Sequence, residues 1–313
     1  MANVISVSKS IKARISKYAK GYVHDEKAIE EAVSLLRNPV MAYCNSEIRG
    51  SGKGQKALLY RYLRAAAKDP RGFPYVLQGN IGTCVGASYK FGVDCLRAIR
   101  MLRSQHAYPY VAGASIEIIY GGSRVEIGMN GRGAPFGGRD GSNGSWAVRW
   151  LMKYGIVLML KHQVEGKVFD LTEYSVPRAR EYGKYGCPDP LEAVAKEFPV
   201  QTASILGGWE ELRDGMAGAG GVPVIATSWL PTDKRDGQGF AKMYYSPREG
   251  HAQVVMAMDD SNSRPGALIV NTWPLNWISG PKKFGDEPEG SYWVDAETFD
   301  KICKERDTWI LND

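Results

Sequence analysis

The sequence predicts an α+β fold in which a helical half precedes a β-rich half. A helical pattern begins at Cys84 and continues through Phe91, Cys95, Ile99 and Leu102, whose spacing of four and three places them on one face. Residues 191–313 instead contain short apolar runs separated by long loops, which is typical of an antiparallel sheet. These runs are Val222–Trp229, His251–Met258, Ala267–Asn271 and Ser291–Val294. We expect a functional cleft where the two halves meet.

Length and composition bound the class of protein. The chain has 313 residues, enough for a sizeable core, and a composition ordinary for a globular protein. It contains no apolar run of membrane-spanning length, and its first residues do not resemble a secretory signal. The cysteines are odd in number and widely spaced, so we expect reduced thiols and an intracellular protein without a zinc motif. They are Cys44, Cys84, Cys95, Cys187 and Cys303.

Residues 1–71 are predicted to form a basic, mainly helical N-terminal extension. The first 24 residues carry five basic side chains and no acidic one. Ile11, Ile15, Tyr18 and Tyr22 recur at helical spacing opposite the lysines. We expect an arm that docks on a partner protein, on nucleic acid or on an acidic surface. A solvated basic helix and an organelle-targeting peptide remain alternatives.

The remaining segments complete the predicted fold. Further helices are expected at Asp25–Leu36, Ala57–Lys68, Trp146–Lys153 and Trp209–Met216. Residues 50–56 are predicted to be a flexible linker, because their spacing does not match a phosphate-binding loop. Residues 113–145 are rich in glycine and contain two strand-like pieces, Ser115–Tyr120 and Ser123–Ile127. Glycine lets one backbone approach another, so we expect this region to form a wall of a peptide-binding cleft.

A candidate nucleophile lies at the start of the central helix. Cys84 follows the glycine-bearing loop 78–83, and the free N–H groups of a helix N-terminus favour a thiolate over a thiol. Gln78 lies six residues upstream, and its amide together with the Cys84 N–H would supply two donors to an oxyanion. A small buried cysteine with no chemical role is the alternative.

The candidate base is His251, which opens an apolar run of strand length. Asn271 closes the next run and can accept a hydrogen bond from one imidazole nitrogen, leaving the other nitrogen for the thiol. Trp273 and Trp277 would keep water away from this pair. The alternative is a histidine whose hydrogen bonds are satisfied within the core. The other histidines, which we expect at the surface, are His24, His106 and His162.

Four segments resemble motifs of papain-like cysteine peptidases, and they occur in that family's order. Residues 78–88 resemble the active-site segment, and Gly250-His251-Ala252 resembles the histidine strand. Residues 271–277 resemble the asparagine motif. Asp140-Gly141-Ser142, with the residues up to Ile156, resembles the segment whose Gly-Gly strand binds substrate backbone. The resemblance covers roughly residues 72–313.

The resemblance implies a two-subdomain fold, with a helical half at roughly 72–190, an antiparallel β-barrel half at 191–313 and an active-site cleft between them. It implies a cysteine-type peptidase that cleaves a peptide or protein substrate and needs no metal or organic cofactor. The implied catalytic residues are Cys84, His251, Asn271 and Gln78. The residues expected to contact substrate are Gly141, Ser142, Gly82 and Trp273.

The sequence departs from the family at positions that bear on specificity and activity. Val85 stands where the family usually has tryptophan, and Ile81 replaces a disulfide cysteine. Pro274 and Ile278 replace glycines of the asparagine motif, and Ser142 replaces the second glycine of the substrate strand. The set of Gln, Cys, His and Asn is nevertheless complete.

Other functions remain open at this point. The same residues would serve a peptidoglycan amidase or endopeptidase, or a transferase. An inactive structural component of a virion or another large assembly is a further alternative, and a cleft plugged by the N-terminal segment would favour it. An inhibitory pro-segment ranks below a docking arm, because the family's usual pro-segment motifs are not found in residues 1–71. We expect the protein in the cytoplasm of the producing cell or within a virion, as a homo-oligomer or part of a larger assembly.

Overall fold

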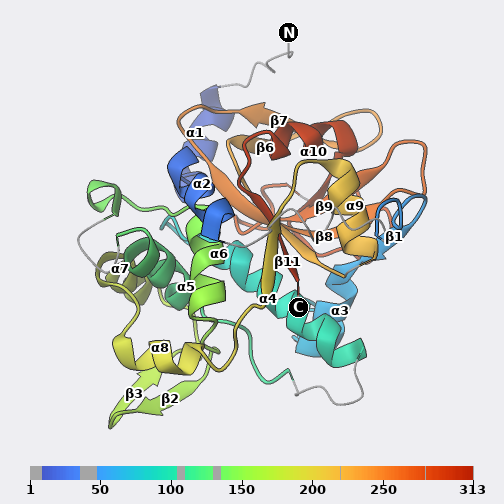
Figure 1. Ribbon diagram of the computed structural model, residues 1–313. Coiled ribbons are helices and arrows are strands. Elements are labelled where there is room, and N and C mark those ends of the chain that lie inside the picture. Colours follow the sequence, from blue (N-terminus) through green and yellow to red (C-terminus); the bar gives the residue numbers. More distant parts are fainter. Residues whose placement is uncertain are drawn as a thin grey trace.

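The computed structural model describes residues 9–35, 48–103, 110–129, 135–218, 220–278 and 280–312 (Figure 1). The predictions for Cys44, for His106 and for the end of the helix expected at Asp25–Leu36 fall outside these ranges.

The N-terminal extension contacts both halves of the molecule. Its elements are α1 (Lys9–Tyr18), α2 (Glu26–Leu35), β1 (Lys56–Leu58) and α3 (Leu59–Ala67). Helix α1 lies against strand β6 (Trp229–Arg235), whereas α2 lies against helix α6 (Gly144–Lys153) (Figure 1). The predicted helical spacing holds only as far as Tyr18, because the chain beyond it runs without helix towards α2.

The helical half is built around one long helix. This helix is α4 (Cys84–Arg103). The helices around it are α5 (Ile116–Gly122), α6, α7 (Val176–Tyr185) and α8 (Asp189–Ala195). A hairpin of β2 (Lys161–Val164) and β3 (Lys167–Asp170) and a 3₁₀ turn at Pro135–Gly138 complete this half. Helix α4 is buried on nearly every side because it lies between α5 and the sheet. A Cβ on Gly86 would lie 2.9 Å from the Ile116 carbonyl oxygen, so glycine here permits the close approach of α5.

The strand-like pieces predicted at Ser115–Tyr120 and Ser123–Ile127 are wrong. The first forms α5, and the second continues it as a π-helix over Ser123–Ile127. Their β-branched residues favour strands by propensity. Every residue from Ile116 to Gly122 is buried, and a helix that packs on all sides needs no polar face. Burial therefore overrides the local preference.

The β half is an antiparallel sheet of seven strands, in the order β10-β9-β8-β5-β11-β4, with β1 also paired to β8. Its strands are β4 (Thr202–Ile205), β5 (Val222–Thr227), β8 (His251–Asp259), β9 (Gly266–Val270), β10 (Ser291–Asp295) and β11 (Thr308–Asn312), with α9 (Trp209–Ala217), α10 (Ala296–Cys303) and the β6–β7 (Ala241–Tyr245) hairpin around it. The four predicted strands and the helix at Trp209–Met216 are confirmed. The register places Val270, the last residue of β9, beside Val254 of β8.

The segment predicted to be a flexible linker is instead tied to the β half. The backbone N–H groups of Gly50 and Gly52 donate to the Asp214 carboxylate of α9, over 2.7 and 3.1 Å. The Gly54 N–H donates to Asp260 Oδ2 over 2.8 Å. These bonds satisfy the loop's donors and fix the turn before β1.

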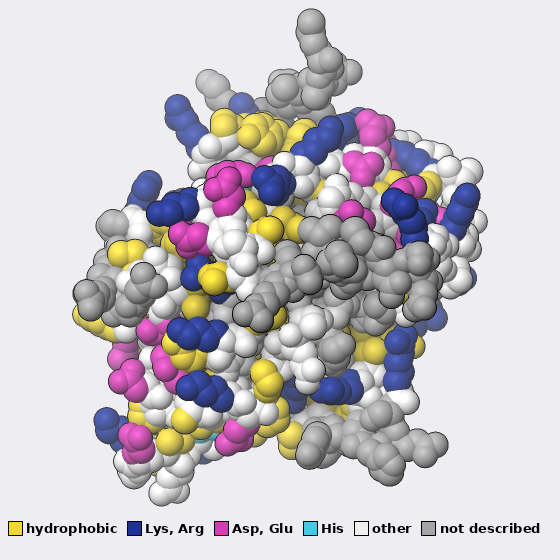
Figure 2. All heavy atoms as spheres, viewed as in Figure 1, with side chains coloured by type: hydrophobic (Ala, Val, Ile, Leu, Met, Phe, Trp, Pro, Cys, Tyr) yellow, Lys and Arg dark blue, Asp and Glu magenta, His cyan; other side chains and the backbone are white. Residues whose placement is uncertain are grey.

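On the face seen in Figure 2, basic and acidic side chains are interspersed. Across the described residues, no helix is long and apolar enough to cross a bilayer, and no cluster of metal-binding side chains is found. The four described cysteines, Cys84, Cys95, Cys187 and Cys303, are free and buried.

Candidate active site

Cys84 is the first residue of α4, and its side chain is fully buried. The Ala252 N–H donates to its Sγ over 3.4 Å, so the thiol lies against the start of β8. The structure thus brings the candidate nucleophile, at the start of α4, to the first residues of β8.

His251 is buried at the start of β8, where it pairs with Thr227 of β5. Its Nε2 lies 2.7 Å from Asn271 Oδ1, and its ring stacks on Trp273 with centroids 4.3 Å apart. Asn271 Oδ1 also accepts from the N–H groups of Thr272 (2.8 Å) and Trp273 (3.2 Å). Two backbone donors identify this atom as the oxygen, so Nε2 of His251 must carry the proton. The Nδ1 lone pair is left free to act as a base.

Gln78 is buried and is held by the β half. Its N–H donates to the Thr272 carbonyl (3.1 Å), and its Oε1 accepts from the Thr272 hydroxyl (2.7 Å). Its Nε2 donates to the carbonyls of Ile81 (3.3 Å) and Tyr18 (3.2 Å). The amide group predicted to bind an oxyanion is therefore already occupied.

A piece of the N-terminal extension, residues 18–23, leaves the end of α1 and covers the thiol. The Ser142 N–H donates to the Gly21 carbonyl, and the Val23 N–H donates to the Ser142 carbonyl, each over 2.9 Å. A Cβ on Gly21 would lie 2.3 Å from Cys84 Sγ. Glycine is thus the residue that lets this backbone cross directly over the sulfur. The placement favours the inhibitory role that the sequence alone ranked below a docking arm.

The covering segment sets the electrostatics of the site. Burial raises the pKa of Cys84 to about 12 and lowers the pKa of His251 to about 3, against the smaller opposing effect of its bond to Asn271. Both groups are neutral at pH 7 in this arrangement, because neither charge is solvated. Burial by the segment therefore disfavours a thiolate–imidazolium pair, and departure of the segment would favour it.

The residues predicted to contact substrate are placed around the same segment. Ser142 offers its backbone N–H and carbonyl to it, whereas the Gly141 N–H donates to the Tyr120 hydroxyl and its carbonyl accepts from Arg124. A Cβ on Gly82 would lie 2.9 Å from the Lys20 carbonyl oxygen. Trp273 is fully buried behind His251. The roles of these residues towards a substrate stay predictions.

Sequence reasoning missed how the segment is anchored. Tyr18 lies with its ring 6.1 Å from the rings of both Trp273 and Trp277, and the Arg14 guanidinium stacks on Trp277 at 4.5 Å. The sequence predicts an amphipathic helix that carries aromatic residues, but it does not indicate the surface against which these residues pack. A cavity of about 800 Å³ remains open beside the segment, between residues such as Arg139 and Arg248.

Comparison with solved structures identifies the architecture. Xylellain, a cysteine protease from Xylella fastidiosa, is 18% identical, with a TM-score of 0.51 over 95% of this chain and 96% of that one. The chain has the papain-like cysteine protease fold. Procathepsin L 3 of Tenebrio molitor is 13% identical over 98% and 100% of the two chains (TM-score 0.48), and the proform of the ragweed protease Amb a 11 is 14% identical over 94% and 76% (TM-score 0.49). The assignment of the fold rests on xylellain.

At the level of sequence, no family model and no curated protein matches the chain. The α+β fold predicted from the sequence is confirmed.

Proposed function

We propose that this chain is a cysteine peptidase whose thiol is covered by its own residues 18–23. The observation that carries the proposal is the backbone that lies across Cys84. Its Gly21 carbonyl and Val23 N–H both bond to the backbone of Ser142. A cleft that holds one polypeptide backbone in this way is suited to hold another. The papain-like fold supports peptide substrates in general.

In the proposed reaction, the segment first leaves and a substrate backbone pairs with Ser142. His251 Nδ1 takes the thiol proton, and the Cys84 sulfur attacks the peptide carbonyl carbon. The oxyanion accepts from the Cys84 N–H and from Gln78 Nε2, which has been released from the Tyr18 carbonyl. His251 then gives its proton to the leaving amine, and a thioester remains. Water, deprotonated by His251, hydrolyses the thioester and restores the thiol.

A structural role without catalysis is the second candidate, because a cleft filled by the chain's own N-terminal segment is expected of such a protein. The retained bonds of His251, Asn271 and Gln78 favour the enzyme instead. A protein that needs only the fold has no use for a buried imidazole with a fixed tautomer and a free Nδ1.

The test is hydrolysis of fluorogenic peptides, denatured protein and peptidoglycan by the full chain, from acidic to alkaline pH. Cys84→Ala and His251→Ala are each introduced into two backgrounds, the wild type and Gly21→Ala. Cys187→Ala is the matched cysteine control. Peptide hydrolysis lost in Cys84→Ala and His251→Ala but kept in Cys187→Ala would support the peptidase. Cleavage confined to peptidoglycan would indicate the amidase. The structural role would follow if no background showed hydrolysis that depends on Cys84.

A further inference from the structure

The loop between Gln78 and Cys84 decides whether the two proposed oxyanion donors converge. It is a short irregular segment, in which Gly79 has a φ of 71° and the Thr83 N–H bonds back to the Ile81 carbonyl (2.9 Å). A loop with so few internal bonds depends on its neighbours for its shape. The donors at its two ends therefore need an external support.

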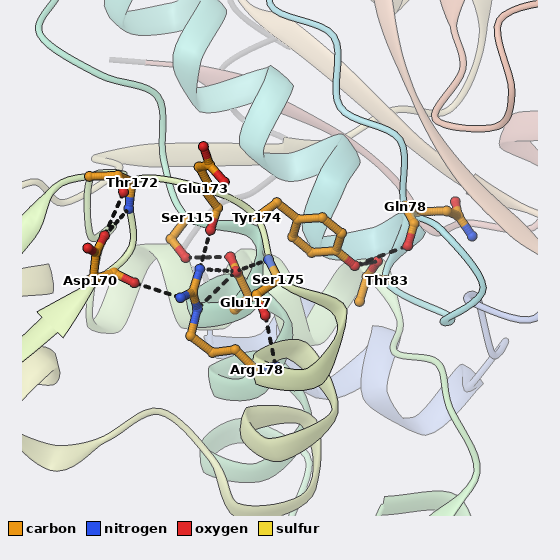
Figure 3. A network of polar contacts seen from close by, with 10 residues as sticks. All are labelled: Gln78, Thr83, Ser115, Glu117, Asp170, Thr172, Glu173, Tyr174, Ser175 and Arg178. Atoms are coloured by element: carbon orange, nitrogen blue, oxygen red, sulfur yellow. Dashed lines mark hydrogen bonds and ion pairs between the residues drawn. The ribbon is translucent and has the colours of Figure 1, made fainter.

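Tyr174 reaches both ends of this loop with one hydroxyl (Figure 3). The hydroxyl donates to the Gln78 carbonyl over 3.0 Å and lies 3.0 Å from Thr83 Oγ1. A phenol has a single proton, and the Gln78 carbonyl can only accept. The Thr83 hydroxyl must therefore donate to Tyr174, which connects the residue before the nucleophile with the residue of the oxyanion amide.

Tyr174 is itself held next to an ion pair whose carboxylate is buried. The N–H of the next residue, Ser175, donates to Glu117 Oε1 over 2.9 Å, and Arg178 Nη2 donates to the same oxygen over 2.7 Å. The Ser115 hydroxyl occupies the other oxygen of Glu117 at 2.9 Å. Glu117 is fully buried in α5, so the start of α7 is fixed to the core of the helical half (Figure 3).

The β half holds Gln78 from the opposite side through Thr272, the residue after Asn271. Gln78 thus lies between Tyr174 and Thr272. Displacing either contact would move the amide relative to the Cys84 N–H. Burial raises the pKa of Tyr174 to about 12, so its hydroxyl remains a donor at neutral pH.

We propose that Tyr174 is a positioning residue of the reaction, which keeps the Gln78 amide and the Cys84 N–H aimed at one oxyanion. The inference rests on the proposed peptidase function and extends it to a residue outside the four motifs. Tyr174 does not touch the reacting atoms; it acts through the loop 78–83.

The test compares two reactions of Cys84 in the full chain: acylation by an activated peptide ester and alkylation by iodoacetamide. Both reactions need an uncovered thiol. The ratio of the acylation rate to the alkylation rate is therefore independent of how often residues 18–23 leave. Acylation alone passes through an oxyanion, and losing one oxyanion donor costs about 10²–10³ in rate. For a displaced rather than deleted donor, we expect Tyr174→Phe to lower the ratio by about tenfold.

Thr83→Val is expected to lower the ratio similarly, and Thr83→Ser, which keeps the hydroxyl, to restore it. Tyr185→Phe is the matched control, because Tyr185 ends α7, the helix that follows Tyr174, and 69% of its surface is exposed. An unchanged ratio in Tyr174→Phe with an unchanged melting temperature would overturn the inference. Failure of the proposed peptidase function gives a different result, in which iodoacetamide alkylates wild-type Cys84 but the peptide ester never acylates it. That result would overturn the inference as well.

Discussion

At the scale of single residues, Asp307 joins the helical half to the β half. Its carboxylate accepts from the Gly144 N–H (2.8 Å) and Ser145 Oγ (2.8 Å) at the start of α6, and from Trp309 Nε1 (2.9 Å) of β11. The side chain is fully buried. Burial outweighs the three donors and raises the pKa of Asp307 to about 6. The contact between the halves therefore includes a carboxylate that titrates near neutral pH.

This pKa predicts a pH-dependent stability. Because the pKa is higher in the folded than in the unfolded chain, protonation favours the folded state. The gain is complete below the unfolded pKa of 3.8 and is lost as the pH rises through about 6. We expect the free energy of unfolding of the wild type to fall by about 2 kcal/mol relative to Asp307→Asn between about pH 4 and about pH 7.

Denaturant titrations at several pH values measure this difference. The asparagine side chain places an N–H opposite one of the three donors, which lowers the stability of the variant. This cost does not vary with pH, so the comparison uses only the slope of the free energy of unfolding against pH. Parallel stability curves for the two proteins would contradict the raised pKa.

At the scale of elements, α1 anchors the segment that covers the thiol. The helix ends at Tyr18, whose ring lies against the rings of Trp273 and Trp277, and the next five residues cross the cleft. A helix that packs by aromatic contacts can hold an extended segment in place while keeping its basic side chains in solvent.

Removing this anchor should loosen the segment. Aromatic pairs contribute about 0.5–1.5 kcal/mol each beyond the area they bury, so Tyr18→Ala is expected to raise the open population by about tenfold. The measurement is hydrogen exchange of the Val23 amide, which donates to the Ser142 carbonyl in the covered state. Tyr185→Ala, at an exposed position of α7, is the control. Equal exchange rates in Tyr18→Ala and the wild type would exclude α1 as the anchor.

At the scale of the whole molecule, the predictable features are those set by local pattern. The apolar runs gave the strands of the β half because β8 and β9 are buried on both faces. The resemblance to a family of cysteine peptidases predicted that Cys84, His251 and Asn271 would meet. In the fold, His251 contacts Asn271, and Cys84 Sγ accepts from the N–H of Ala252, the residue after His251.

The features that could not be predicted depend on distant contacts. The pieces around Ile116 and Val125 have strand propensity but are helical, because the surrounding helices bury them. The path of residues 18–23 depends on Ser142 and Trp273, more than a hundred residues away. The contact of Tyr174 with Gln78 and Thr83 likewise spans the helical half and follows no sequence motif.

The most direct test of the account is the rate at which an epoxide inhibitor labels Cys84 in Gly21→Ala. The added methyl group would meet Sγ at 2.3 Å and the Gly82 carbonyl oxygen at 2.9 Å, so it should push the segment off the thiol. Overpacking of this kind costs about 1–3 kcal/mol, which predicts labelling at least about fivefold faster than in the wild type. Gly237→Ala is the matched control, because a Cβ there meets nothing within 4 Å. Equal labelling of Cys84 in the wild type, Gly21→Ala and Gly237→Ala would contradict a thiol covered by residues 18–23.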